Sequence, residues 1–460
     1  MRKKLFAILA LVIFLSLIFW GSTRPQGAED DIMSLFDNKK ETIYFWYDDA
    51  SMSDYINGAA VMFSEKYDVR VLPQLVSESK YLEAINHATL YEEHVPDAYL
   101  ISNDSLEKAY LTGLAAPVKD VANRMNTVHF PQVALDAVTY KGKQVAYPLY
   151  FETSVLLYNE TYLKDWAKQQ AVREAEAAQG TEEAEGATEM LQDEAALQAR
   201  ADEILKTAVP ETIDDILKVA DTFDPPENVE GIFKWDVSDI FYNYYFVGNY
   251  MDVGGTTGDD PAQLNINNPE VISCLEIYKA LNEFFYIESD KVTYESVLQD
   301  FMDGKIMFTI VTTDALAILE QAKKAEEFAY DYGVAMLPDI GEKLESRSLS
   351  VTGVVAVNGY SKKAELAEQF AVYLSTDYAP RMYERCGRMA SYYHVKYAND
   401  LFAVFMQEYE RSVSLPKMIE TGNYWVQLEI LFSKVWNGGE VAGLVEELAQ
   451  KMNEQVQIKD

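Results

Sequence analysis

The chain has 460 residues, enough for two or three domains that each bury a core. Its 39 Lys and Arg against 74 Asp and Glu leave a formal net charge of −35, which repels phosphate backbones and argues against a nucleic-acid partner. The two cysteines, Cys274 and Cys386, are too few for a disulfide framework, and no cysteine–histidine spacing indicates a metal site. We therefore expect no metal and no other cofactor.

The N-terminus predicts export. Arg2, Lys3 and Lys4 precede an apolar run from Leu5 to Trp20, the pattern of a signal peptide or of a short membrane anchor. We expect residues 1–21 to be either a signal peptide or a membrane anchor, and the sequence pattern fits both. Residues 22–40 are a polar linker, so the rest of the chain is expected on the extracellular side of the membrane, anchored or secreted after cleavage.

Strands and helices alternate from residue 41 onward. Strands are predicted at 42–47, 69–72 and 98–101, and helices at 53–67, near 81–88 and at 106–111. This order is typical of a mostly parallel sheet with helices on both faces, in which ligands bind beyond the carboxyl ends of the strands. The acids at those positions are Asp48, Asp49 and Asp104, although Asp104 has helix capping as its alternative.

Residues 147–159 place one acid between two apolar halves. Glu152 follows Tyr150 and Phe151 and precedes a predicted buried strand at 155–157. Burying a carboxylate among such neighbours is costly unless something binds it. Glu152 is therefore either a solvated residue at a strand edge or a residue that faces the gap where the chain passes from one domain to another.

Residues 167–207 form an insert rich in Ala, Glu and Gln, which favours helix but offers little to bury. It predicts a helical hairpin that turns near 180–186, with disorder as the alternative. The aromatic stretch at 233–250 follows. Because not all of its rings are expected to point inward, Trp235 and Tyr242 with the neighbouring Asp239 predict a wet pocket in which sugar faces stack on rings.

Three more strands are predicted at 306–311, 332–338 and 350–357, and the first of them is followed by Thr312 and Thr313. Near the C-terminus, 424–435 keeps a helical period, with Trp425 beside the apolar stripe and not within it.

Several of these segments, taken in order, resemble the family 1 extracellular solute-binding proteins, the maltose-binding-protein group that delivers sugars to ABC importers. The matching segments are 96–104 (PDAYLISND), 113–117 (GLAAP), 147–159 (YPLYFETSVLLYN), 301–307 (FMDGKIM), 334–338 (VAMLP), 353–357 (GVVAV) with 361–367 (SKKAELA), and Tyr424-Trp425. Three features depart from the family pattern: the chain has no lipobox cysteine, a long insert and many tyrosines.

The resemblance implies an α/β fold with two lobes and a ligand cleft between them, the type II form of the periplasmic-binding-protein fold. The expected lobes are 41–151 with 312–358, and 152–311 with 359–460. Matching residue by residue, Glu152 faces ligand, Asp48 and Asp104 are loop acids, and Trp425 stacks on sugar. Thr312 and Thr313 stand where the family often has an aromatic residue. The full set of expected ligand-binding residues is Trp46, Asp48, Asp49, Asp104, Glu152, Trp235, Asp239, Tyr242, Thr313 and Trp425.

The function implied is capture of a mono- or short oligosaccharide by a monomer that passes it to the permease subunits of an ABC transporter. Catalysis is not expected, because no Ser/His/Asp order, phosphate-binding loop or zinc motif is present. Two alternatives remain. One is an anchored sensor subunit of a signalling system. The other is a binder of a polyamine, a peptide or ferric iron, the last through Tyr244-Tyr245 or Tyr392-Tyr393.

Overall fold

The structure is a computed structural model that describes residues 40–77, 79–178, 191, 193–419 and 422–457. The predicted signal peptide or anchor and the linker lie outside these residues. Within them, no helix combines the length and the apolarity that crossing a membrane requires.

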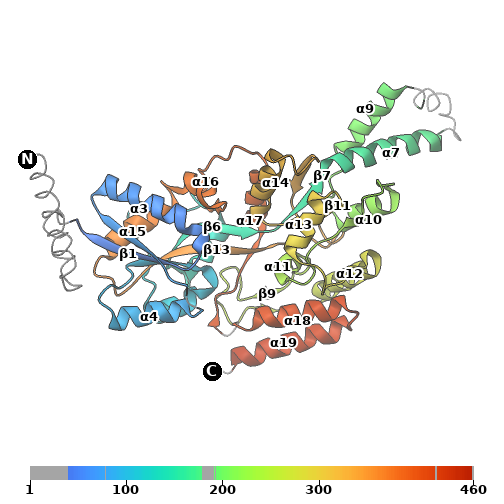
Figure 1. Cartoon of the computed structure of the whole chain (residues 1–460). Coiled ribbons are helices and arrows are strands. Elements are labelled where there is room, and N and C mark those ends of the chain that lie inside the picture. Colours follow the sequence, from blue (N-terminus) through green and yellow to red (C-terminus); the bar gives the residue numbers. More distant parts are fainter. Residues whose placement is uncertain (1–39, 78, 179–190, 192, 420–421, 458–460) are drawn as a thin grey trace, which may run out of the picture.

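The chain forms two lobes, each built on its own sheet (Figure 1). The sheet of lobe 1 has the order β14-β6-β13-β3-β1-β2, with β15 pairing β13. Strands β1, β2 and β3 are parallel, whereas β13 runs antiparallel to both β3 and β6. The bounds are β1 Thr42–Tyr47, β2 Arg70–Leu75, β3 Ala98–Ser102, β6 Tyr147–Thr153, β13 Leu349–Val357, β14 Met389–Ala390 and β15 Val413–Ser414.

The sheet of lobe 2 has the order β12-β7-β11-β8, with bounds β7 Val155–Asn159, β8 Gly231–Phe233, β11 Ile306–Val311 and β12 Tyr332–Ala335. Strand β6 of lobe 1 and strand β7 of lobe 2 are separated only by Ser154, which is fully buried. The chain therefore crosses between the lobes two residues after Glu152, in agreement with the second interpretation of that segment.

Helices cover the sheet of lobe 1 because each has one apolar face. In α3, for example, Tyr55, Ile56, Ala59 and Phe63 are buried and the intervening residues are largely exposed or half-buried. The helices of this lobe are α3 Ser53–Tyr67, α4 Tyr81–Tyr91, α5 Leu106–Leu111, α6 Gln132–Ala137, α15 Ala364–Ser375, α16 Met382–Cys386 and α17 Phe402–Arg411.

In lobe 2, local sequence sets the helix starts. Thr212 and Asp215 form a capping box at the start of α10, and Asn268 caps α12 ahead of a proline in its first turn. The helices are α10 Ile213–Thr222, α11 Ile240–Asn243, α12 Pro269–Phe285, α13 Tyr294–Met302, α14 Asp314–Lys324, α18 Tyr424–Trp436 and α19 Val441–Gln457.

Short elements complete the fold. Two small antiparallel pairs are β4 Thr139–Tyr140 with β5 Lys143–Gln144, and β9 Asp252–Val253 with β10 Leu264–Asn265. The 3-10 turns are η1 Ala50–Met52, η2 Asn103–Ser105, η3 Tyr244–Phe246 and η4 Ala379–Arg381.

The expected lobe boundaries need correction. Residues 312–358 were expected in lobe 1, but β12 pairs with β7 and so belongs to the sheet of lobe 2. Residues from 359 were expected in lobe 2, but α15 packs on β6 and β13, and β14 pairs with β6. Both buried sheets use similar apolar strands, so the sequence pattern does not say which sheet a strand joins.

The insert is helical where it is described. Helices α7 Glu160–Ala178 and α9 Glu194–Leu205 pack side by side and project from lobe 2 (Figure 1). Ala171 and Ala175 of α7 and Ala201 of α9 are buried, which allows close helix contact despite the lack of large apolar residues. The turn predicted near 180–186 lies outside the described residues.

Candidate functional site

An ion-paired cluster lies on lobe 1 close to the crossing. Arg388 lies between two carboxylates: its Nη2 is 2.6 Å from Asp49 Oδ2, and its Nη1 forms an ion pair with Glu152 Oε1. The guanidinium carbon also lies 4.6 Å from the ring centroid of Tyr150, a cation–π contact. Arg388 was not among the residues expected from the sequence.

Strand pairing explains why Arg388 is there. In the antiparallel pair β6–β14, Met389 lies opposite Phe151 and Ala390 opposite Tyr150. One step further along each strand, Arg388 lies opposite Glu152. Asp49 reaches the same place because it follows β1, and its carboxylate also accepts the N–H of Ser51 at 2.8 Å. The partner of Glu152 is thus 236 residues away in the chain, which no local pattern reveals.

The two aspartates after β1 differ electrostatically. Burial alone would raise the pKa of Asp49, but the hydrogen bonds from Ser51 and the charge of Arg388 outweigh it and hold that pKa below its ordinary value. For Asp48, burial dominates and raises the pKa, and the neighbouring Asp49 adds to the effect. Lobe 1 therefore presents one carboxylate with a cationic partner and one beside it that has lost part of its hydration.

Lobe 2 presents a tyrosine pair. The rings of Tyr242 on α11 and Tyr294 on α13 stack with centroids 5.1 Å apart and an interplanar angle of 6°. The Tyr294 hydroxyl donates to Asp314 Oδ1 at 2.9 Å, and the Thr312 hydroxyl bonds to the same carboxylate oxygen. Burial raises the pKa of both tyrosines well above the usual range, so their hydroxyls stay protonated and available as donors.

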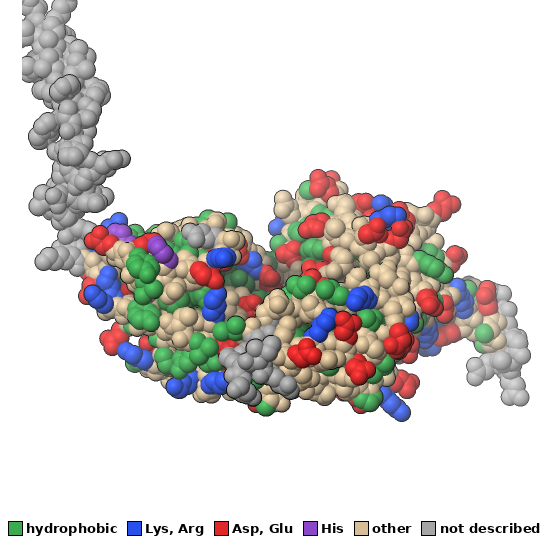
Figure 2. Space-filling view, turned by 90° about the horizontal axis from the view of Figure 1, so that it is seen from below, with side chains coloured by type: hydrophobic (Ala, Val, Ile, Leu, Met, Phe, Trp, Pro, Cys, Tyr) green, Lys and Arg blue, Asp and Glu red, His purple; other side chains and the backbone are tan. Residues whose placement is uncertain are grey.

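The two clusters converge on the crossing. Val311 lies opposite Val155 in the β11–β7 pair, so Thr312 comes next to Ser154, two residues from Glu152. The space-filling view shows a notch between the two lobes (Figure 2). The candidate site combines two clusters near the crossing: Asp48, Asp49, Glu152 and Arg388 of lobe 1, and Tyr242, Tyr294, Thr312 and Asp314 of lobe 2.

The remaining expected acids lie at loop positions. Asp239 caps α11 by accepting the N–H of Phe241 at 2.8 Å, and burial raises its pKa. Asp104 is exposed in the η2 turn that follows β3. Thr313 is only 3 % exposed, so its neighbour Thr312 is the better placed of the two threonines.

Two of the three expected tryptophans lie in the core. Trp235 has no exposed surface, stacks on Phe233 at 4.5 Å, and donates its indole N–H to Asn243 Oδ1 at 2.8 Å. Trp46 is 5 % exposed within β1. Trp425 stays half-buried at the start of α18, where its ring centroid is 6.1 Å from that of Tyr244.

Most rings of the 233–250 segment are buried, which limits how many of them can face a wet pocket. The buried members are Phe233, Trp235, Tyr242, Tyr244, Tyr245 and Phe246, with only Phe241 and Tyr250 half-buried. The indole N–H of Trp235 bonds Asn243, whereas the buried hydroxyl of Tyr245 has no partner among the described residues. This aromatic-rich segment therefore packs mainly in the core of lobe 2.

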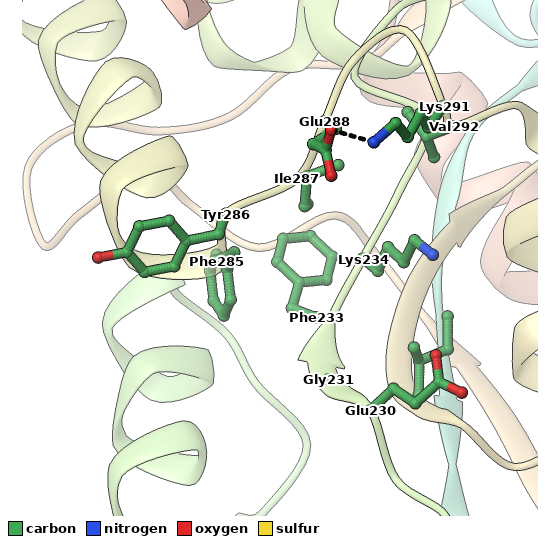
Figure 3. Close-up of a pocket in the computed structure, with 11 residues that line it drawn as sticks. Glu230, Gly231, Phe233, Lys234, Phe285, Tyr286, Ile287, Glu288, Lys291 and Val292 are labelled. Atoms are coloured by element: carbon green, nitrogen blue, oxygen red, sulfur yellow. Dashed lines mark ion pairs between the residues drawn. The ribbon is translucent and has the colours of Figure 1, made fainter.

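A separate pocket of about 310 Å³ lies at the free edge of β8 (Figure 3). Phe233 and Phe285 lie side by side there, below an ion pair between Glu288 and Lys291. None of the expected site residues lines it. It therefore plays no part in the site at the crossing.

The lobes also meet where a loop of lobe 2, residues 254–260, rests on lobe 1. Lys417 is 1 % exposed there, and its ammonium donates to the carbonyl of Asp136 in lobe 1 at 2.9 Å and to that of Thr257 in the loop. Burial lowers the pKa of Lys417 to about 8. Lys141 of lobe 1 holds the same loop through the backbone and side chain of Asp259.

Comparisons with known proteins agree with this architecture. Among solved structures, an extracellular solute-binding protein from Staphylococcus aureus in complex with maltose matches with a TM-score of 0.71 and 20 % identity, over 92 % of this chain and 100 % of that one. A cyclo/maltodextrin-binding protein complexed with maltotetraose matches with a TM-score of 0.69 and 18 % identity, over 92 % of this chain and 98 % of that one. The maltose-binding periplasmic protein of Listeria monocytogenes in complex with maltose matches with a TM-score of 0.68 and 17 % identity, over 92 % of this chain and 100 % of that one.

At such identities, these three structures establish the two-lobed fold and nothing more. A search of curated protein sequences finds no match. The family model described as "Bacterial extracellular solute-binding protein" matches residues 58–383, well over half of the chain. The chain therefore belongs to the bacterial extracellular solute-binding proteins.

Proposed function

We propose that the chain is an exported binding protein that captures a mono- or short oligosaccharide in the notch between its lobes and delivers it to the permease of an ABC transporter. The observation that carries this proposal is the position of Glu152 near the end of β6, two residues before Ser154, which comes next to Thr312 of the other lobe. A ligand at this point contacts both lobes, so its binding favours the closed arrangement.

The chemistry of the walls suits a sugar. The carboxylates of Asp48, Asp49 and Glu152 accept hydroxyl hydrogen bonds, while Arg388 donates them. The ring of Trp425, half-buried at the start of α18, offers an apolar face for sugar C–H groups. The printed titles of the compared structures name maltose and maltotetraose as the ligands of those proteins.

A thermal-shift screen against a carbohydrate panel tests the proposal, because a ligand that binds only the folded state raises the melting temperature. With the ligand identified, Glu152→Gln is expected to weaken binding about tenfold to a hundredfold, since a charge-assisted hydrogen bond contributes about 1.5–3 kcal/mol. Trp425→Ala is expected to weaken it at least as much.

The matched controls are Glu194→Gln on α9 and Tyr91→Ala on α4, whose side chains are exposed. Trp166 is not a suitable control, because it is 6 % exposed and its indole N–H donates to the Thr222 hydroxyl at 3.0 Å. If both site variants fold and bind the ligand with unchanged affinity, the ligand does not bind at the crossing.

A further inference from the structure

A cavity lies between the lobes, apart from the candidate site at the crossing. It has a volume of about 330 Å³ and both lobes line it: Asp136 comes from α6 of lobe 1, and Tyr250 and Asp252 come from lobe 2. None of the residues of the candidate site lines it. Gln132 and Thr256 also line it and are exposed, so a small molecule can reach the cavity from solvent.

Arg347 is the cation among the lining residues, and it lies where the chain crosses between the lobes for the second time. The residue before it, Ser346, donates its N–H to the Asp339 carboxylate of lobe 2, and β13 of lobe 1 begins two residues after it. The N–H of Arg347 donates to the Tyr245 carbonyl at 3.2 Å, and Gly248 has no side chain to keep the Arg347 backbone away. The backbone of Arg347 is therefore held in place against lobe 2.

The guanidinium of Arg347 has unused donors. Its Nε donates to the Arg411 carbonyl, but neither Nη has a hydrogen-bond acceptor or an ion-pair partner among the residues that the structure describes. Arg347 is also half-buried, so it has lost part of its hydration without gaining a partner in return. A guanidinium presents a planar fork that fits a carboxylate with two parallel hydrogen bonds. A ligand carboxylate is therefore the group that suits Arg347.

Two half-buried carboxylates line the same cavity. Asp136 accepts the side-chain amide of Gln132 at 2.8 Å, and Asp252 accepts the N–H of Gly255 at 2.9 Å, each on one oxygen. The other oxygen of each accepts no hydrogen bond from a described residue, and neither acid forms an ion pair with one. Glu410, a third acid of the lining, is exposed and keeps its water. Asp136 and Asp252 therefore suit an ammonium group.

The charges of the lining argue against a simple anion and against a simple cation. An anion would meet three acids and one arginine, and a cation would leave Arg347 without a partner. A molecule that carries both a carboxylate and an ammonium matches both kinds of group. Val133, Met251 and Val413 also line the cavity and offer an apolar wall to an aliphatic side chain. The volume is at the lower end of the range for small-molecule sites, about 300–1,000 Å³, which suits a ligand of this size.

We propose that this cavity binds a free α-amino acid with an aliphatic side chain, its carboxylate on Arg347 and its ammonium on Asp136 and Asp252. The inference goes beyond the proposed function and does not rest on it, because the cavity and the candidate site share no residue. Asp136 belongs to lobe 1 and Asp252 to lobe 2, so the bound amino acid joins the lobes and favours the arrangement in which both acids reach it.

The test is calorimetric titration of the full chain with three probes of one aliphatic skeleton: L-leucine, isocaproate and isoamylamine. Isocaproate is L-leucine without its ammonium, and isoamylamine is L-leucine without its carboxylate. L-leucine is expected to bind at least about tenfold more tightly than either, because each of the others loses a charge-assisted hydrogen bond.

Two results of these titrations would overturn the inference. The first is equal affinity for L-leucine and for either of the other probes, because one of the two charged contacts would then contribute nothing. The second is the absence of any L-leucine binding at millimolar concentration.

Variants assign the amino acid to the cavity. Arg347→Gln and Asp252→Asn are each expected to weaken L-leucine binding about tenfold or more, while the exposed Arg381→Gln and Asp221→Asn leave it unchanged. Melting curves verify folding, and Arg347→Lys, which keeps the charge but not the fork, replaces Arg347→Gln if that variant does not fold. Unchanged affinity in the folded cavity variants, or loss of L-leucine binding in Glu152→Gln alone, would place the amino acid elsewhere and overturn the inference.

Discussion

The lobes meet in two different ways. At the candidate site, the polar groups bond within their own lobe: Arg388 with Asp49 and Glu152 in lobe 1, and Tyr294 with Asp314 in lobe 2. At the contact of loop 254–260, one buried side chain, Lys417, bonds carbonyls of both lobes. The second region ties the lobes together through one side chain, whereas the polar groups named at the first bond only within their own lobe.

The largest expected effect comes from Lys417→Met, which removes the buried tie. The pKa of Lys417 is about 8 in the folded protein, below its ordinary value of 10.5. Between pH 8 and 10.5 the unfolded chain therefore binds more protons than the folded one, so the stability of the wild type rises with pH in this range. The unfolding free energy of wild type minus that of the variant is expected to rise by up to about 3 kcal/mol from pH 8 to 10.5.

Urea unfolding at several pH values measures this difference. Lys362→Met is the control, because Lys362 is exposed. The difference in unfolding free energy between wild type and this control is expected not to change with pH. A flat difference for Lys417→Met as well would mean that Lys417 is not a buried cation between the lobes.

The next effect is that of Arg388→Gln, which leaves Asp49 and Glu152 facing each other without a cation. We expect a loss of about 1–3 kcal/mol at pH 7, the usual cost of removing one partner from a partly buried polar pair. Arg385→Gln on α16, three residues earlier in the chain, is the control, since the pair of Arg385 with Asp54 is more exposed and is expected to contribute less than about 1 kcal/mol.

Arg388→Gln is also expected to change how the stability depends on pH in the acid range. The pKa of Asp49 is lowered in the folded protein, so its contribution is full above its ordinary value of 3.8 and is lost as pH falls through the folded-state value. Without Arg388, this loss is expected to shrink. Equal acid dependence in wild type and variant would show that Arg388 does not hold that pKa down.

A smaller effect is expected from Tyr294→Phe, which removes the hydroxyl that donates to Asp314 and leaves the stacked ring. The expected cost is about 1 kcal/mol, typical of one net hydrogen bond. Tyr286→Phe serves as the control because Tyr286 is 81 % exposed. If Tyr294→Phe is as stable as this control in thermal unfolding, the hydroxyl network of lobe 2 contributes nothing to folding.

The smallest effect concerns the projecting hairpin. The ion pair between Glu174 on α7 and Arg200 on α9, at 2.8 Å, marks a place where the two helices can be joined. Replacing residues 175–199 by a short flexible linker between these two residues is expected to change ligand affinity less than about twofold, because no wall residue is lost. A tenfold loss, about 1.4 kcal/mol, would show that the hairpin supports the site.

Much of the fold followed from local pattern. The strands predicted at 42–47 and 306–311 and the helix predicted at 53–67 coincide with β1, β11 and α3, because each has a clear period and clear ends. The helix at 424–435 also keeps its predicted stripe, with Tyr424 and Leu428 buried and Trp425 half-buried beside it.

The site was less predictable, because it depends on pairing between distant segments. Glu152 was recognised from its apolar neighbours, but Arg388 reaches it only through the β6–β14 pairing. Trp235 looked like a pocket wall, and its burial depends on Asn243 taking its indole N–H. Local sequence reports how apolar a residue is, but not which distant residue completes its environment.

The place of β13 has a consequence for the order in which the chain can fold. In the sheet of lobe 1, β13 lies between β3 and β6, yet it comes almost two hundred residues after β6 in the sequence. The chain cannot join β3 to β6 until residue 357 has emerged, and β14 and β15 of the same sheet come later still. By then the four strands of the lobe 2 sheet have also emerged. Lobe 1 can therefore not form as an early, separate unit, and the exposed edges of β3 and β6 stay open to mispairing until late in synthesis or export.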